Sequence, residues 1–209
     1  KEQQRLLKQA QFFFFFVYKN VVWPKGSAKI LEPGCGVGAQ SAIMLRRFPD
    51  IQITGLDRSQ SQLSAAKQNL AKHIKDKRVT LVHGSGEKLP FEEATFHGAF
   101  ICWLLEHVPD PTKLLKEIHR VLQPGSVVYA TEVLNSSFYL SPYSPATLQY
   151  WFHFNDHQWN MGGDPFCGAK LGNLLLDAGY QEISTEVISH HLDKRFPKTR
   201  NEHLKSFYN

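Results

Sequence analysis

Three glycines at alternate positions, Gly34, Gly36 and Gly38, lie between a short apolar segment and a helical pattern. Glycine allows a tight backbone turn and lets a ligand approach the chain without a Cβ in the way. The N–H groups at the start of the following helix add positive potential. This combination predicts a site for a ligand that contains a nucleotide-like part. The loose GxGxxA spacing, which ends at Ala39, is compatible with more than one such ligand.

Two acidic residues flank the glycine turn. Glu32 comes just before it, at the end of the apolar segment, where a carboxylate can organise a cationic ligand and its loop. Asp57 ends the next β-branched segment, IQITGLD, and a carboxylate at that edge can accept both hydroxyls of a ribose. An N-cap for the next helix is a second role open to Asp57. NAD and S-adenosylmethionine both carry a ribose, so Asp57 does not choose between these cofactors.

Strand-like and helix-like segments alternate before residue 134 and must position these residues. We expect an α/β fold of the Rossmann-like, doubly wound kind, with a mostly parallel sheet flanked by helices. Right-handed crossovers place the carboxyl ends of all strands at one edge, where ligands bind. The expected strands are residues 29–33, 51–57, 79–84, 96–103 and 126–133, and the expected helices are residues 39–47, 59–74 and 111–122.

The remaining segments are less regular, and we interpret residues 1–209 as a single domain built around a core at 29–134. Residues 1–28 are expected to be helical over 2–20. The five-Phe run at 12–16 makes that helix apolar nearly all round, which predicts burial against the sheet, a lid or a second subunit of a homodimer. Residues 135–166 are rich in aromatic residues, Ser and Pro, and are expected to be an insertion.

Residues 167–209 are expected to hold a helix over 168–178 and a sixth strand over 182–190. No seventh strand is recognisable, and the first residue is Lys1 rather than Met. We therefore expect the sequence to lack residues of a longer protein.

The composition is that of an ordinary globular domain, with 42% hydrophobic and 21% charged residues. No apolar run is long enough to span a bilayer. The three cysteines, at 35, 102 and 167, have no CxxC spacing, which argues against a zinc site or a disulfide framework and favours a reducing cytoplasm. The net charge is +5, but the lysines are scattered among acids. We therefore expect neither a nucleic-acid partner nor a metal.

Four segments resemble, in order, the motifs of class I S-adenosylmethionine-dependent methyltransferases. The resemblance is to the small-molecule branch, methyltransferase types 11 and 25, which includes the ubiquinone and menaquinone biosynthesis enzymes. ILEPGCGVGAQ resembles VLDxGCGxG, and ITGLDRS resembles the segment that ends in the ribose-binding acid. GSGEKLPFEEATFHGAF resembles GDAExLPFxDxSFDxV, and CWLLEHVPDPTKLLKEIHRVLQPGS resembles VLEHVxDPxxxLxExxRVLKPGG. Residues 161–180 resemble a segment before the sixth strand in the same branch.

The resemblance implies S-adenosyl-L-methionine as cofactor and S-adenosyl-L-homocysteine as product. It implies cofactor contacts at four places: the glycine turn and the loops after the second, third and fourth strands. The implied residues are Glu32, Gly34, Cys35, Gly36, Gly38 and Gln40 for the methionine part, Asp57 and Arg58 for the ribose, Ser85, Gly86 and Glu87 for the adenine, and Cys102 and Trp103 again for the methionine part.

This sequence departs from the family pattern at three positions. Ser85 replaces an Asp that accepts from the adenine amino group, and a serine hydroxyl accepts more weakly. His97 replaces another Asp, and Ser126 replaces a glycine. The first departure bears on the adenine contact, and the other two bear on turns and packing.

The family's reaction transfers a methyl group to an O, N or C nucleophile of a small organic molecule, mainly by proximity and orientation. His107 is the best-placed general base, with a hydrogen-bonding role at a helix start as the alternative. The aromatic insertion is expected to form a lid over the site, or else a satellite core. Its candidate substrate residues are Tyr139, Tyr150, Trp151, His153 and Trp159.

Three other functions are possible from the sequence. An NAD-dependent oxidoreductase would use the glycine turn but leaves the LPF and LEHVPDP segments unexplained. A nucleic-acid methyltransferase acting on base amino groups carries an Asn/Asp-Pro-Pro-aromatic motif where this chain reads Cys-Trp-Leu-Leu at 102–105. A non-catalytic protein that binds S-adenosylmethionine stays open, because catalysis by proximity leaves no obligatory catalytic residue.

Overall fold

A five-stranded sheet forms the centre of the molecule in a computed structural model that describes residues 2–208, with side chains to residue 202. All neighbouring strands are parallel, and their order is β3-β2-β1-β4-β5. This order reverses direction between β1 and β4, so a crevice is expected at the carboxyl ends of these two strands. The strands are β1 (Lys29–Pro33), β2 (Gln52–Asp57), β3 (Val79–His83), β4 (Phe96–Cys102) and β5 (Leu122–Thr131). The predicted α/β fold is confirmed.

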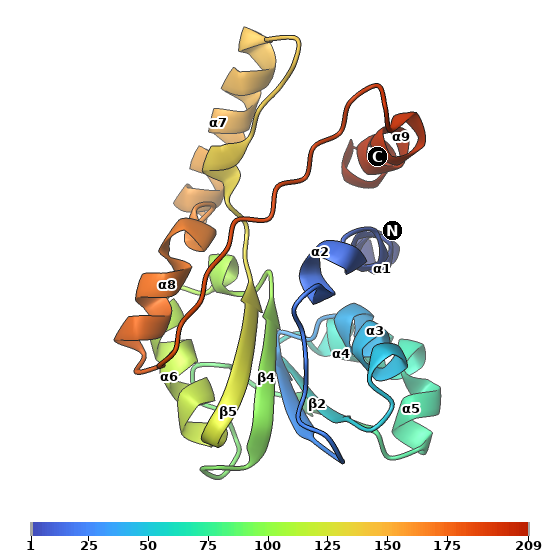
Figure 1. The fold of residues 1–209 in the computed structure, drawn as a ribbon, viewed down its shortest axis with the longest axis vertical. Coiled ribbons are helices and arrows are strands. Elements are labelled where there is room, and N and C mark those ends of the chain that lie inside the picture. The colour runs from blue at the N-terminus through green and yellow to red at the C-terminus, as the bar shows by residue number, and fades with distance from the viewer. Residues whose placement is uncertain (1, 209) are drawn as a thin grey trace.

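Helices cover both faces of the sheet, as Figure 1 shows. One face carries α3 (Ala39–Arg47), α4 (Gln60–Asn69) and α5 (Ala71–Lys75), and the other carries α6 (Pro111–Val121) and α8 (Cys167–Asp177). Consecutive strand residues point to opposite faces, so Ile30 belongs to one buried cluster and Leu31 to the other. Strands that are buried on both faces need continuous apolar runs, which is why the sequence pattern located them.

Local capping explains where several helices begin. Asp110 accepts a hydrogen bond from the backbone N–H of Lys113 at 2.9 Å, and Pro111 occupies the first turn of α6. Ser59 caps α4 in the same way. The expected single helix over 59–74 is instead two helices. The helix is interrupted at Leu70, which is fully buried against the glycine turn.

The N-terminal helices lie above the carboxyl ends of the strands. They are α1 (Glu2–Phe12) and α2 (Phe14–Tyr18) in place of one expected helix over 2–20. Val17 and Tyr18 are buried, whereas Phe15 is 81% exposed. The Phe run is therefore only partly a core element. No helix in the described part of the chain is both long and apolar enough to cross a membrane.

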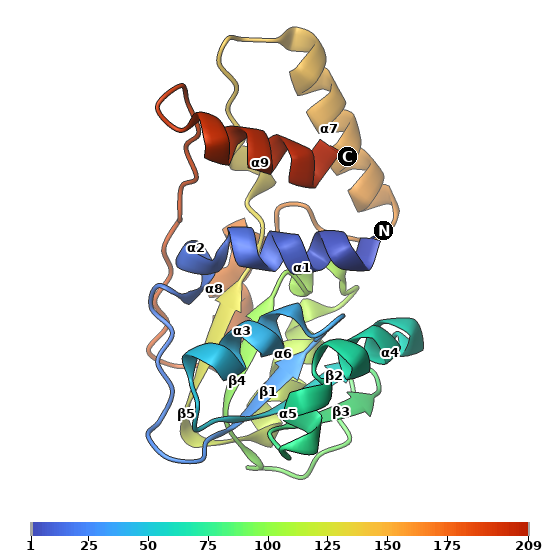
Figure 2. The same cartoon turned by 90° about the vertical axis from the view of Figure 1, so that its right-hand side faces the viewer.

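A projecting arm follows β5. It comprises residues 135–160, with the short helix η2 (Asn135–Ser137) and the long helix α7 (Pro145–Asn160). Figure 1 shows α7 rising well beyond the carboxyl ends of the strands. The last helix, α9 (Pro197–Tyr208), lies across from it above α1, as Figure 2 shows. The arm and α9 thus stand on different sides of the same sheet edge.

The expected sixth strand over residues 182–190 was wrong. This segment is extended but forms no ladder, and β5 pairs only with β4 among the described residues. Side chains hold the segment instead: Glu186 accepts from Asn20 at 2.6 Å, and His190 packs on the rings of Phe12 and Phe16. Alternating β-branched residues predict an extended backbone, but pairing also requires a neighbouring strand edge in register.

Candidate functional site

The glycine turn, residues 34–38, connects β1 to α3 at the edge where the strands end. Gly34, Gly36 and Gly38 have φ angles of 67°, 52° and 75°, in the left-handed region that favours glycine. A Cβ on Gly34 would lie 2.6 Å from Leu104, and one on Gly38 would lie 2.6 Å from Leu70. A Cβ on Gly36 would meet nothing within 4 Å. The turn is therefore packed at its two ends and open in its middle.

Asp57 connects this turn to the second strand. One carboxylate oxygen accepts the N–H of Gly36 and the other accepts the N–H of Ser59, both at 2.8 Å. A carboxylate has about four lone-pair sites, so hydroxyls of a ribose can still bind to Asp57. Arg58 contributes its carbonyl to the neighbouring loop, where it accepts from the His83 ring at 3.0 Å. The N-cap of the next helix is Ser59 rather than Asp57.

Glu32 lies beneath the turn and not on its open side. Its side chain is buried and hydrogen-bonded to the hydroxyl of Ser41 on α3. The pKa of Glu32 is raised to about 8, mainly by burial and also by the nearby Asp57 charge, although the hydrogen bonds with Ser41 act to lower it. Glu32 is therefore largely neutral at neutral pH and ties β1 to α3. Cys35 is also buried, with its thiol directed at Gly55 of β2.

Gln40 is held by two neighbours at the start of α3. The Tyr18 hydroxyl donates to its side-chain oxygen at 2.7 Å, and its amide nitrogen donates to the Cys102 sulfur at 3.4 Å. Tyr18 is itself fully buried and stacks on Phe100 with ring centroids 5.2 Å apart. Through this chain of contacts, α2 fixes the side of the turn that faces β4. The role of Tyr18 was not found from the sequence.

The loop after β4 lies next to the turn. Trp103 has a φ angle of 52°, its N–H donates to the carbonyl of Thr131, and its ring packs edge-on against Phe13 at 5.5 Å. The side chain of Leu104 contacts Gly34, as described above. Glu132, just past the end of β5, accepts the N–H groups of both Leu104 and Leu105. The loop after β4 thus meets the glycine turn and the start of α3 through two residues, Cys102 beside Gln40 and Leu104 beside Gly34.

The predicted adenine loop follows β3. Ser85 is exposed, and its hydroxyl accepts the N–H of Glu87 at 3.3 Å. Glu87 forms an ion pair with Lys113 on α6 at 3.4 Å. Gly86 packs closely on α6, since a Cβ there would meet Cδ1 of Leu114. The loop is therefore held at both ends, with the Ser85 side chain directed to solvent.

The Glu106–His107 pair lies in η1 (Leu105–His107), beyond the cofactor edge. Glu106 is buried and accepts from the Gln158 amide of α7 at 2.7 Å. His107 is exposed, with its Nε2 3.7 Å from the Glu106 carboxylate. Glu106 therefore has a hydrogen-bonding role and holds the base of the arm to the core. Sequence reasoning did not identify Glu106 as that link.

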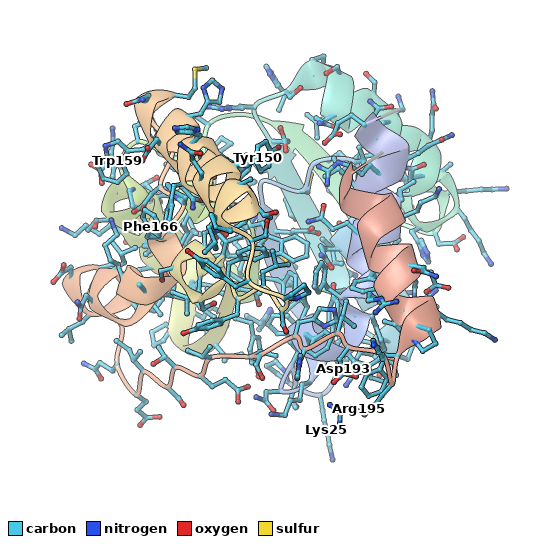
Figure 3. The ribbon with its side chains drawn as sticks, turned by 90° about the horizontal axis from the view of Figure 1, so that it is seen from above. Lys25, Tyr150, Trp159, Phe166, Asp193 and Arg195 are labelled. Carbon is cyan, nitrogen blue, oxygen red and sulfur yellow. The ribbon has the colours of Figure 1, made fainter. Side chains whose placement is uncertain are left out.

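The candidate substrate residues lie along the arm. Tyr139 is 89% exposed and Trp159 is 57% exposed, and Figure 3 shows Tyr150 and Trp159 on α7, far from Asp193 and Arg195 near α9. His153 is exposed as well. Trp151 differs, because its ring stacks on Phe138 and Phe154 and its Nε1 donates to the carbonyl of Asn135 at 3.0 Å. The arm is thus packed at its base and open along its length.

A shallow hollow at the opposite edge of the sheet gathers none of these residues. It lies at the amino ends of the strands, among surface lysines, threonines and two phenylalanines. Because parallel sheets bind ligands at their carboxyl ends, we assign it no role in the site. Its lining includes Lys29, Gln52, Thr54, Arg78, Thr80, Phe91 and Thr95.

Residues 31–130 match the family profile described as a methyltransferase domain. This part of the chain is therefore similar to the S-adenosylmethionine-dependent methyltransferase domains of class I. The matched residues contain the end of β1, all of β2 to β4, nearly all of β5, the glycine turn, Asp57, the loop after β3 and the loop after β4. The cofactor predicted from the four motifs is confirmed.

Curated relatives match this same part of the chain. An O-methyltransferase of Aspergillus nomiae, rstn1, is 36% identical over 98 residues, which is 47% of this chain and 43% of the relative. Demethylmenaquinone methyltransferase of Staphylococcus aureus is 36% identical over 117 residues, which is 56% of this chain and 47% of the relative. The matched region is therefore less than half the length of each of these relatives.

Solved structures extend the likeness beyond the motifs. The [4+2]-cyclase SpnF is 26% identical, with a TM-score of 0.60, over 84% of this chain and 57% of that protein. A phosphoethanolamine N-methyltransferase 2 of Haemonchus contortus, solved with S-adenosyl-L-methionine, has a TM-score of 0.64 at 21% identity, over 95% of this chain and 41% of that one. The second likeness shows the fold alone.

Proposed function

We propose that this protein transfers the methyl group of S-adenosylmethionine to an O, N or C nucleophile of a small organic molecule. The observation that carries the proposal is the glycine turn, which is packed at Gly34 and Gly38, open at Gly36, and held by the Asp57 carboxylate. The bound cofactor supplies an electrophilic methyl group on a sulfonium.

The residues at this edge suit S-adenosylmethionine. Gly36 leaves room for the ligand to approach the backbone, and the Asp57 carboxylate keeps acceptor sites for the ribose hydroxyls. The neutral Glu32 adds no negative charge at neutral pH, so it orients the turn through Ser41 instead of pairing with the ligand. In this proposal the exposed Ser85 hydroxyl accepts a hydrogen bond from the adenine.

The acceptor would lie between the loop after β4 and the arm. Trp103 and Leu104 border this region on the cofactor side. The base of α7 borders it on the other side. Catalysis would rest on holding the nucleophile in line with the methyl group while water is excluded. In this proposal the candidate substrate residues of the arm, among them Tyr139, Tyr150 and Trp159, approach the acceptor as a lid. His107 lies at the arm's base and is the candidate base for acceptors that must lose a proton.

A second function is favoured by one finding. A cyclase is structurally similar over most of this chain, so the fold is compatible with a reaction other than methyl transfer. In that case the chain would bind S-adenosylmethionine as a structural element. The two functions share the cofactor site and differ in whether S-adenosylhomocysteine accumulates.

The test has two stages. Calorimetry should show that the protein binds S-adenosylmethionine and S-adenosylhomocysteine and does not bind NAD. Incubation with methyl-labelled cofactor and a panel of phenols, quinols, amines and enols should then label an acceptor. NAD binding without S-adenosylmethionine binding would overturn the proposal, and tight cofactor binding with no labelled product across the panel would favour the second function.

A further inference from the structure

Glu132 lies immediately beyond β5, opposite the loop that follows β4. One of its carboxylate oxygens, Oε1, accepts the N–H of Leu104 at 3.0 Å and the N–H of Leu105 at 2.8 Å. Bonds from N–H groups to a carboxylate are stronger than bonds between neutral groups. Two such bonds at one oxygen fix the position of the loop relative to β5.

The conformation of the loop fits this contact. Trp103, just before the two N–H groups, has a φ angle of 52°, and the 3₁₀ helix η1 begins at Leu105. Successive N–H groups after a left-handed residue point to the same side and form a concave anion site. A side chain of this chain, Glu132, occupies that site. The acid therefore stabilises a strained turn that is otherwise costly.

The loop is in turn packed against the cofactor side. A Cβ placed on Gly34 would lie 2.6 Å from Cδ1 and 3.1 Å from Cδ2 of Leu104, so the leucine side chain fills the space beside the glycine turn. Any shift of the loop backbone would move this side chain and release the turn. Contacts thus run without a break from Glu132 through Leu104 to Gly34.

We propose that Glu132 is a positioning residue for the cofactor, which acts through Leu104 on the glycine turn. The inference rests on the proposed function only in taking this turn as the S-adenosylmethionine site. Glu132 touches neither the turn nor the ligand region itself, and its effect on binding is indirect.

The surroundings of Glu132 give the proposal a pH dependence. Its second oxygen, Oε2, is buried without a hydrogen-bond partner among the described residues. The titratable groups around it are Glu106 on η1, Cys102 on β4 and Cys167 on α8. The pKa of Glu132 is raised to about 7, mainly by burial and also by the Glu106 charge, although the backbone N–H groups of Leu105, Leu104 and Glu106 act to lower it. Glu132 therefore ionises near neutral pH, and the ionised form is the stronger acceptor for the loop.

The experiment compares cofactor affinity in two variants with the wild type. Calorimetry with S-adenosylhomocysteine should show Glu132→Ala weaker by about tenfold or more, the order expected for a lost charge-assisted hydrogen bond. Glu132→Gln keeps a carbonyl oxygen for the two N–H groups and should stay within about threefold of the wild type. Wild-type affinity should rise between about pH 6 and about pH 8, whereas Glu132→Gln should lack that part of the rise.

A matched control separates positioning from loss of stability. Tyr180→Phe removes a partly buried hydrogen bond of 3.0 Å to the Leu115 carbonyl, which joins the segment just after α8 to α6 away from the turn. It should lower the melting temperature without changing affinity. A folded Glu132→Ala variant that binds like the wild type would overturn the proposal. Failure of the wild type to bind the cofactor would instead overturn the proposed function.

If Glu132→Ala does not fold, the Leu104→Ala variant tests the proposal instead. This variant leaves the carboxylate and both backbone bonds in place and removes the packing on Gly34. It should weaken S-adenosylhomocysteine binding several-fold. Unchanged affinity in Leu104→Ala, together with a wild-type pH profile in Glu132→Gln, would overturn the proposal.

Discussion

The cofactor side and the arm of this molecule are built in different ways. On the cofactor side, backbone groups of the glycine turn and the loop after β4 are held by the carboxylates of Asp57 and Glu132, above two buried apolar clusters. The arm carries its aromatic side chains into solvent, and residues 133–155 contain no Asp, Glu, Lys or Arg. Its attachment rests on a few contacts at its base, such as Gln158 with Glu106.

This difference assigns the two substrates of the proposed reaction to two kinds of structure. The chemistry of the cofactor is fixed, and the backbone groups on its side are held rigidly by hydrogen bonds to nearby residues. The acceptor side depends on a helix that can be repositioned as a unit, because its base has few anchors. Changes on the cofactor side should therefore alter cofactor affinity, whereas changes in the arm should leave it intact.

The largest effect is expected at Asp57. Asp57→Ala removes the acceptor for the N–H groups of Gly36 and Ser59, together with the predicted ribose contacts. Loss of two or more charge-assisted hydrogen bonds should lower S-adenosylhomocysteine affinity by about 100-fold in calorimetry. Asp156→Ala, at an exposed carboxylate on the arm, is the control and should bind normally. Equal affinities in the two variants would remove the distinction between the two regions.

A smaller loss is expected at the open glycine. Gly36→Ala adds a methyl group on the open side of the turn and places a residue other than glycine at a φ of 52°. The strain costs about 1–2 kcal/mol of stability, and affinity should fall by about tenfold or more. Gly125→Ala is matched to it: Gly125 has a φ of 77°, no atom near the added Cβ, and a place far from the turn. Gly125→Ala should lose similar stability and no affinity. If both variants lost affinity to a similar extent, the loss in Gly36→Ala would be due to backbone strain alone.

The pH dependence of stability should report on the protonation of Glu32, which is buried beneath the glycine turn. Glu32 has a pKa of about 8 in the folded chain against 4.5 as its ordinary value, so the folded state retains a proton that the unfolded chain releases between these pH values. The free energy of unfolding therefore falls as pH rises through this window, by up to about 1.4 kcal/mol per pH unit from this group. The free energy of unfolding, measured with urea between about pH 5 and about pH 8, should fall less steeply with pH in Glu32→Gln than in the wild type.

The control for this experiment is Glu87→Gln, at a carboxylate that forms an ion pair with Lys113 on the surface. The free energy of unfolding of Glu87→Gln should change with pH in the same way as that of the wild type. Parallel curves for Glu32→Gln and the wild type would mean that Glu32 is ionised in the fold, contrary to its placement beneath the turn.

The smallest effect is expected at the base of the arm. Asn155 is buried and accepts a hydrogen bond from Asn135 at 2.9 Å. Asn155→Ala should lower the free energy of local opening by about 1 kcal/mol, seen as severalfold faster proteolysis within residues 135–160. Affinity for S-adenosylhomocysteine should not change. A loss of affinity would show that the arm and the cofactor side are coupled more tightly than the contacts indicate.

The parts of the fold that could be predicted are those that local sequence determines. The central strands β1 and β4 are largely buried on both faces, and the glycine turn needs left-handed backbone that only its residue type favours. The break at Leu70 could not be predicted, because it depends on packing against Gly38 from a distant part of the chain. The extended segment over 182–190 had a strand pattern, but no pattern shows whether a partner strand is present.

The site was predictable in its motifs and not in its supports. Asp57 and the glycines could be found because each stands at the end of a strand with a characteristic neighbour. Glu132 also comes directly after a strand, so its position carried a similar signal, although it lies outside the four motifs. Tyr18 and Ser41 left no such signal, since their hydrogen bonds with Gln40 and Glu32 exist only after helices and sheet have packed.

The outer edge of β5 has a consequence for handling the protein. This strand pairs on one side only within the described residues, and its ten residues include no Lys, Arg, Asp or Glu. An edge strand with unpaired backbone groups and no charge is a template on which another chain can add a strand. Aggregation of this chain should therefore grow with concentration, and a lysine at an outward position of β5 is the substitution that should keep it dispersed.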